Sequence, residues 1–168
     1  MDLYHIRMIV VIMGTTGSGK TTIGQLLAAK LNWKFADADD FHSPANIAKM
    51  KQGIALSDAD RRPWLAAIRS QIAQWLSQKK NVVLACSALK QNYRAELLLS
   101  DEVKLVYLKG DYAVIVKRLQ MRLHHFADEH LLASQFATLE EPSGAISIDI
   151  NHSPAEIVDE ICRKLGLA

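Results

Sequence analysis

The sequence predicts an α/β fold of three layers, in which a five-stranded parallel sheet lies between helices. Three observations lead to this prediction. Short apolar runs alternate with helical patterns, at least three runs are apolar at every position, and 168 residues with 49% hydrophobic and 23% charged content suit one globular domain. Because strands covered on both faces show no polar alternation, these runs indicate a parallel sheet. We expect residues 1–168 to form a single domain.

Each predicted element has its own signal. Ser43 before Pro44 is typical of a helix start, and Gly53 suits a helix end, so a short helix is predicted over 44–52. Ser57 and Asp60 resemble a capping box that opens a helix running to about residue 79. The predicted strands cover residues 8–13, 34–36, 82–86, 103–108 and 145–150.

Charge and composition exclude several classes of function. Twenty Lys and Arg against 18 Asp and Glu give a net charge of +2, and no block of like charges suggests a nucleic-acid arm. The apolar run 8–13 is far shorter than the roughly 20 residues that span a bilayer. We expect neither a nucleic-acid nor a membrane partner, and, because no small-residue cleavage site follows this run, a cytoplasmic location. Cys86 and Cys162 lack metal or redox spacing, so we expect reduced core thiols.

A phosphate-binding motif follows the first predicted strand directly. Residues 14–21 read GTTGSGKT, a full match to G-x-x-x-x-G-K-[ST], and a helical pattern comes next. Glycines let backbone N–H groups point at phosphate oxygens, Lys20 reaches the β- and γ-phosphates, and the Thr21 hydroxyl serves Mg²⁺. The alternative is a glycine turn without a ligand. The predicted ATP-binding residues are Gly14, Thr15, Thr16, Gly17, Ser18, Gly19, Lys20, Thr21 and Thr22.

Two carboxylates follow the second predicted strand. Asp37 and Asp39 share one side of the chain if the strand continues through them. Beside a phosphate loop, Asp37 can orient Mg²⁺ through water, and Asp39 can accept the proton of an attacking hydroxyl. The alternative is a pair of solvated acids in a loop.

At this point the chain resembles a known family, the small P-loop gluconokinases of bacteria and eukaryotes. The resemblance spans roughly residues 8–150 and rests on the phosphate loop and on residues 37–42, 58–65 and 87–94, which read DADDFH, DADRRPWL and SALKQNYR. It implies ATP-dependent phosphorylation of D-gluconate on its 6-hydroxyl, a nucleoside-monophosphate-kinase-like fold and, commonly, a homodimer.

Gluconate carries a carboxylate and several hydroxyls, so its pocket needs cations together with hydrogen-bond donors and acceptors. Arg61 suits a two-pronged bond to the carboxylate. Alternatively, Arg61 forms a surface ion pair with Asp58 or Asp60. The predicted substrate-binding residues are Asp39, His42, Asn46, Arg61, Lys90 and Arg94.

Simpler roles remain open for three of these residues. His42 can satisfy backbone groups of its own loop instead of meeting substrate. Lys90 and Arg94, four residues apart, can form a solvated helix face.

The weakly periodic, basic and aromatic segment 121–130 predicts a lid that closes over nucleotide. Arg118 and Arg122 lead into it, and we predict that both neutralise the transferred phosphoryl group; the alternative is solvent exposure. His124 stands where the family usually has Gly, and Ala127 where a second Phe is common. The predicted catalytic residues are Lys20, Asp39, Arg118 and Arg122.

Two rival functions share these features. One is another small-molecule kinase of the same fold, acting on shikimate or a related sugar acid. The other is a nucleotide-dependent regulatory module that hydrolyses ATP slowly and signals through ordering of switch loops.

Overall fold

The computed structural model describes residues 6–121 and 125–167 and contains a five-stranded, fully parallel sheet. The strand order is β2-β3-β1-β4-β5, so the first strand lies at the centre. The predicted fold class is therefore confirmed. The strands are β1 (Ile9–Met13), β2 (Lys34–Asp37), β3 (Val82–Ala85), β4 (Val103–Lys109) and β5 (Ile146–Asp149).

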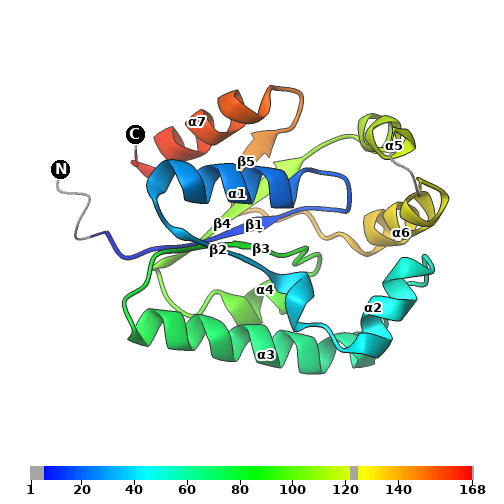
Figure 1. Ribbon diagram of the computed structural model, residues 1–168, viewed down its shortest axis with the longest axis horizontal. Helices are drawn as coiled ribbons and strands as arrows, with labels where there is room; N and C mark the ends of the chain where they lie inside the picture. The colour runs from blue at the N-terminus through cyan, green and yellow to red at the C-terminus, as the bar shows by residue number, and fades with distance from the viewer. Residues whose placement is uncertain (1–5, 122–124, 168) are drawn as a thin grey trace.

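Helices cover both faces of the sheet (Figure 1). One face carries α1 (Lys20–Leu31) and α7 (Pro154–Leu165), and the other carries α3 (Asp58–Ser77) and α4 (Gln91–Leu97). Beyond the carboxyl ends of the strands lie α2 (Pro44–Lys51), α5 (Tyr112–Gln120) and α6 (His125–Thr138). Within the described residues, none of these helices combines the length and apolar character needed to cross a membrane.

The central strand explains why its sequence is apolar at every position. Val10 and Ile12 belong to the core beneath α1 and α7, whereas Ile9, Val11 and Met13 belong to the core beneath α3 and α4. All five side chains are fully buried. A strand that supplies two cores cannot alternate with polar residues, which is the physical basis of the sequence prediction.

Predicted helix signals are also confirmed. The Ser43 hydroxyl accepts from the Asn46 N–H at 3.1 Å, so it caps α2, and Gly53 follows that helix at a φ of +72°. Ser57 and Asp60 exchange both hydrogen bonds of a capping box at the start of α3. These local bonds fix where the segments beyond the sheet begin and end.

The predicted lid segment, 121–130, is only partly described. Its residues 125–130 lie in α6, which continues to Thr138, so this part of the predicted lid is helical. Arg122 and His124 lie outside the described residues. Closure of this segment stays a prediction.

Candidate active site

The phosphate loop joins β1 to α1 at the carboxyl edge of the sheet, where parallel α/β folds place their ligands. Gly17 and Gly19 have φ values of +76° and +99°, which favour glycine. A Cβ on Gly17 would lie 2.9 Å from Ile115 and from Leu119, because α5 packs directly on the loop. Gly17 is thus required by both the turn and its packing, and Gly19 by the turn alone.

The start of α1 is open to an anion. Gly19 occupies the N-cap, no side chain caps the helix, and its first turn contains no acidic residue. The first N–H groups and the positive end of the helix dipole therefore remain for an incoming phosphate. Thr15 nearby has a buried hydroxyl oxygen with no hydrogen-bond partner in the described part of the chain, an orphan that a ligand can satisfy.

Lys20 and Thr21 open α1 on the same side. The Lys20 Nζ donates to the Thr15 carbonyl at 2.8 Å, and the Thr21 Oγ1 donates to the Asp37 Oδ2 at 3.2 Å. The second contact joins the phosphate loop to the end of β2. A hydroxyl and a carboxylate are the hard oxygen ligands that Mg²⁺ prefers, so this pair fits the predicted metal position.

The turn after β2 corrects one prediction. The strand ends at Asp37, and residues Ala38–Phe41 form a 3₁₀ turn in place of a continued strand. The cause is local, because the Asp37 Oδ1 accepts from the Asp39 N–H at 3.0 Å and caps the turn. Asp37 and Asp39 therefore do not share the face of an extended chain, yet both still reach the same cavity.

That cavity has a volume of about 210 Å³ and brings Lys20, Thr21 and both carboxylates together. The Asp39 residue is exposed at the surface, yet nearby protein atoms displace part of the water around its carboxylate. This desolvation and the negative charge of Asp37 raise the pKa of Asp39, while the positive charge of Lys20 opposes the rise. A carboxylate with a raised pKa facing a phosphate loop is a suitable proton acceptor.

Cys86 and Ser87, which follow the end of β3, also line this cavity and were not among the predicted site residues. Because β3 pairs directly with β1, the residues after β3 must face the loop after β1. The strand order would have predicted this position of Cys86 and Ser87, but a single sequence does not specify the strand order. Burial raises the pKa of the Cys86 thiol to about 12, so this cysteine is no nucleophile.

His42 lies behind the acidic turn and stacks on Trp64, with ring centroids 4.4 Å apart. Burial, assisted by Arg61, lowers the pKa of His42 to about 4, so the ring is neutral near pH 7. The Asn46 Nδ2 contacts the His42 Nδ1 at 3.3 Å and donates to the Asp60 carbonyl at 2.9 Å. Since that amide supplies the proton, the proton of the neutral ring is assigned to Nε2. The His42 ring thus contacts the Asn46 side chain, while the bond to its own loop comes from the His42 backbone N–H, which donates to the Asp39 carbonyl at 3.1 Å.

Arg61 and Lys90 come from the first turn of α3 and the N-cap of α4. The Arg61 Nη1 donates to the Tyr93 hydroxyl at 3.2 Å, and the Lys90 Nζ lies 3.1 Å from the Asp58 Oδ1. Within the described residues, Arg61 forms no direct ion pair with Asp58 or Asp60, although its positive charge helps to lower the pKa of Asp58. Its role toward a substrate stays a prediction.

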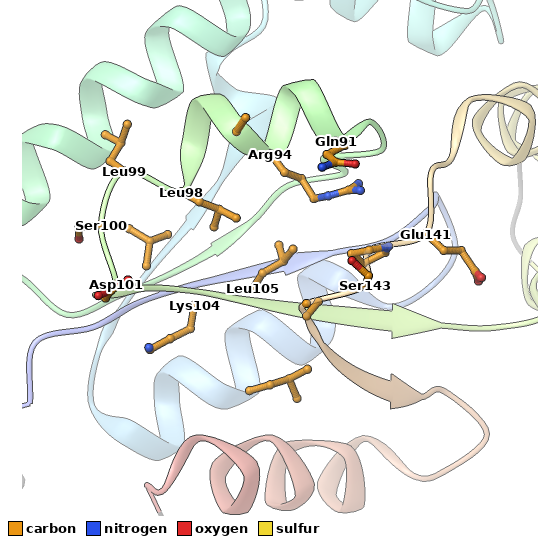
Figure 2. Close-up of a pocket in the computed structure, with 16 residues that line it drawn as sticks. Gln91, Arg94, Leu98, Leu99, Ser100, Asp101, Lys104, Leu105, Glu141 and Ser143 are labelled. Atoms are coloured by element: carbon orange, nitrogen blue, oxygen red, sulfur yellow. The ribbon is translucent and has the colours of Figure 1, made fainter.

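Arg94 is buried, so the solvated-face alternative is wrong for this residue. Its guanidinium donates to the Ala88 carbonyl at 2.8 Å and the Glu140 carbonyl at 2.9 Å, which fastens α4 to the segment after α6. Figure 2 shows Arg94 at one end of a separate cavity of about 730 Å³ between α4, β4 and residues 141–146. These contacts give Arg94 a structural function, and substrate binding by it stays a prediction.

Two further contacts reach the phosphate loop. The half-buried Arg118 donates to the Ile150 carbonyl at 2.6 Å, and its guanidinium lies 4.0 Å from where a Cβ on Gly19 would stand. Full solvent exposure of Arg118 is therefore wrong. The Thr16 N–H donates to the Gln135 Oε1 of α6 at 2.7 Å. Sequence analysis missed Gln135 because 119 residues separate the partners.

Comparison with known proteins relates this geometry to named enzymes. The shikimate kinase family model matches residues 16–166. A probable gluconokinase of Xenopus tropicalis is 43% identical over 92% of this chain and 91% of its own length, and the thermosensitive gluconokinase of Escherichia coli K12 is 43% identical over 94% and 87%. A crystal structure of a gluconokinase from Sinorhizobium meliloti 1021 superposes with a TM-score of 0.86 at 38% identity, covering 96% of this chain and 93% of that one.

Proposed function

The chain belongs to the gluconokinase family, and we propose on that basis that it transfers the γ-phosphoryl group of ATP to the 6-hydroxyl of D-gluconate. One observation carries the proposal most directly: Asp39, with its raised pKa, shares a cavity with Lys20 and Thr21 of the phosphate loop. Phosphoryl transfer needs a proton acceptor next to the bound phosphates, and in this cavity the Asp39 carboxylate lies beside the phosphate loop.

In the proposed reaction, the phosphate loop and the predicted acceptor residues have separate tasks. Backbone N–H groups of residues 14–22 hold the phosphates, while Lys20 stabilises the charge that develops on the transferred group. Asp39 takes the proton of the attacking hydroxyl. Arg118 supplies further positive charge beside Gly19.

The acceptor acid has its own set of proposed contacts. Arg61 and Lys90 bind the carboxylate at the far end of the acid, and the His42 Nε2–H and Asn46 contact its hydroxyls.

Thr21 and Asp37 would hold Mg²⁺, which would neutralise part of the negative charge of the phosphates. Their hydroxyl and carboxylate oxygens lie 3.2 Å apart, which supports this assignment. Titration of activity with Mg²⁺ in wild type and Asp37→Asn tests it: the variant should need more Mg²⁺ for half-maximal rate.

A coupled assay of ADP formation over a panel of aldonic acids tests the function. Gluconate should stimulate ATP consumption well above the rate with ATP alone. Shikimate belongs in the panel because the matching family model is that of shikimate kinase. Stimulation by shikimate and not by gluconate would replace the proposed substrate, and ATP hydrolysis indifferent to every acid would favour the regulatory alternative.

We further propose a homodimer in the cytoplasm. The resemblance to gluconokinases supports the dimer, and two buried free cysteines suit a reducing compartment. Light scattering of the purified protein and fractionation of the source cells test these two points.

A further inference from the structure

Tyr93 lies between the two cations that we assign to the carboxylate of the acceptor. The Arg61 Cζ is 5.5 Å and the Lys90 Nζ is 5.6 Å from the centroid of the Tyr93 ring. Both distances are within the range of a cation–π contact. Tyr93 itself is only 4% exposed, so the ring is held in place by the core beneath it.

The Tyr93 hydroxyl completes a chain of hydrogen bonds with a fixed direction. Asp58 is held ionised, because its bonds to Tyr93 and Lys90 lower its pKa. An ionised carboxylate only accepts, so Tyr93 donates its single proton to Asp58 and accepts from the Arg61 Nη1. Lys90 donates to the same carboxylate at 3.1 Å. Donation therefore runs from Arg61 through Tyr93 to Asp58, and from Lys90 to the same Asp58 carboxylate.

This chain connects groups that the backbone alone would leave independent. Arg61 and Asp58 lie in the first turn of α3, whereas Lys90 and Tyr93 lie at the start of α4. Arginine and lysine side chains have many rotamers, and their ordering opposes binding. A hydrogen-bond chain that orders both cations before the ligand arrives removes part of that cost.

We propose that Tyr93 is a positioning residue that fixes the spacing and orientation of Arg61 and Lys90 for the carboxylate of the acid acceptor. The inference rests on the proposed function, since it names the part of the same site that recognises an acid. It predicts that Tyr93 affects recognition of the carboxylate and leaves phosphoryl transfer itself unaffected.

The first test replaces the hydroxyl alone. Tyr93→Phe keeps the ring and removes both hydrogen bonds, so the KM for gluconate should rise roughly five- to tenfold, the factor expected when a long side chain loses its ordering. The kcat and the KM for ATP should stay within about twofold of wild type, since Tyr93 touches neither the phosphate loop nor Asp39.

Gluconamide sharpens this test, because it keeps the hydroxyls of gluconate and lacks the charge. The kcat/KM for gluconamide should be the same in wild type and Tyr93→Phe, so the preference for the acid over its amide should fall. A merely structural role for Tyr93 would lower kcat/KM for both compounds alike.

Tyr107→Phe is the matched control. Tyr107 is also 4% exposed, and its hydroxyl also donates to a carboxylate, Glu141, at 3.1 Å, but it lies away from both cations. It should leave the preference for gluconate over gluconamide unchanged. Thermal melting of both variants shows whether loss of a buried hydroxyl affects folding equally at the two positions.

Asp58→Asn gives an independent test, because the Ser57–Asp60 capping box stays intact. It should raise the KM for gluconate as Tyr93→Phe does, and the double variant should be no worse than the poorer single one, since both act through one chain. Additive effects, or an unchanged KM in Tyr93→Phe, would overturn the inference while wild-type activity on gluconate upheld the proposed function. A wild type inactive on gluconate would overturn both.

Discussion

The two halves of the proposed site are built in different ways. The half that we assign to phosphate, here called the phosphate wall, is made of consecutive residues, 14–22, whose backbone N–H groups would do most of the binding. The half that we assign to the acceptor, here called the acceptor wall, is made of side chains from the turn after β2 and from α2, α3 and α4, and its Asn46, Arg61 and Lys90 are each held by a partner in another helix. A contiguous backbone site depends on glycines at fixed positions, whereas the acceptor wall depends on tertiary packing.

The walls also differ in how their charge is balanced. At the phosphate wall the N-terminus of α1 has no side-chain cap and no acidic residue in its first turn. At the acceptor wall Lys90 is paired with Asp58, and Lys49 with Asp60 at 2.9 Å. The acceptor wall is thus ordered before ligand binds. Variants of the groups that we assign to the reacting phosphoryl group and hydroxyl should lower kcat, whereas variants of the side chains that order the acceptor wall should raise the KM for gluconate.

Lys20→Ala should have the largest effect, because it removes the charge directed at the transferring phosphate. We expect kcat to fall by about three orders of magnitude or more. The fold should persist, since the Thr15 carbonyl that Lys20 contacts keeps two bonds from Ser18. Steady-state kinetics and circular dichroism measure the two results. Lys30→Ala, at the opposite end of α1 and paired with Asp159, is the control that should keep full activity.

Asp39→Asn should have the next largest effect on kcat, because an amide keeps the shape of the carboxylate and cannot take up a proton. A loss of about two to three orders of magnitude in kcat is expected, with little change in ATP affinity. In wild type, kcat should fall as the pH drops through the raised pKa of Asp39, since only the ionised form is a base. Asp40→Asn, in the same turn, should behave as wild type. A larger loss in Asp37→Asn at saturating Mg²⁺ would exchange the two roles.

The contrast between the walls also explains what a single sequence reveals. The strands, the phosphate loop and the caps at Ser43 and Ser57 are local patterns, and the structure confirms them within one or two residues. The turn at Ala38–Phe41 was not predicted. The prediction extended the strand through Asp39, whereas the Asp37 side chain accepts a hydrogen bond from the backbone N–H two positions later and so favours a turn.

Hydrogen-bond partners that lie far apart in the chain could not be predicted from a single sequence. Arg94 meets Glu140 across 46 residues, and Tyr93 meets Asp58 across 35. The residue types at these positions predicted polar contacts, yet nothing local specified which contacts. Arg94 illustrates the result: its spacing from Lys90 suggested a shared helix face, whereas packing buries Arg94 and leaves Lys90 partly exposed.

A smaller effect is expected at His42, and it concerns stability. The pKa of about 4 in the folded protein lies below the ordinary 6.5, so folding opposes protonation. The stabilisation is therefore complete above pH 6.5 and is lost as the pH falls from 6.5 to 4. Because His42 keeps some contact with solvent, we expect the free energy of unfolding to fall by roughly 2 kcal/mol over this pH range. Urea unfolding of wild type and His42→Gln at pH 7 and pH 4.5 measures it, and the variant should lose less stability on acidification. Equal losses would show that His42 titrates normally.

The smallest expected effect tests whether the phosphate wall is as self-contained as its sequence suggests. The Gln135 Oε1 of α6 accepts from the Thr16 N–H, so a distant helix supports one amide of the loop. Gln135→Ala should cost about 1 kcal/mol, the usual net value of one such hydrogen bond, and weaken ATP binding by a few fold. Gln135→Glu keeps an acceptor and should restore stability, while its negative charge repels phosphate and weakens ATP binding further at low salt. Calorimetric titration with ATP at two salt concentrations, together with urea unfolding, separates these contributions. If both variants bind ATP as wild type does and differ only in KM for gluconate, then α6 serves the acceptor wall, and the phosphate wall needs no support beyond its own consecutive residues.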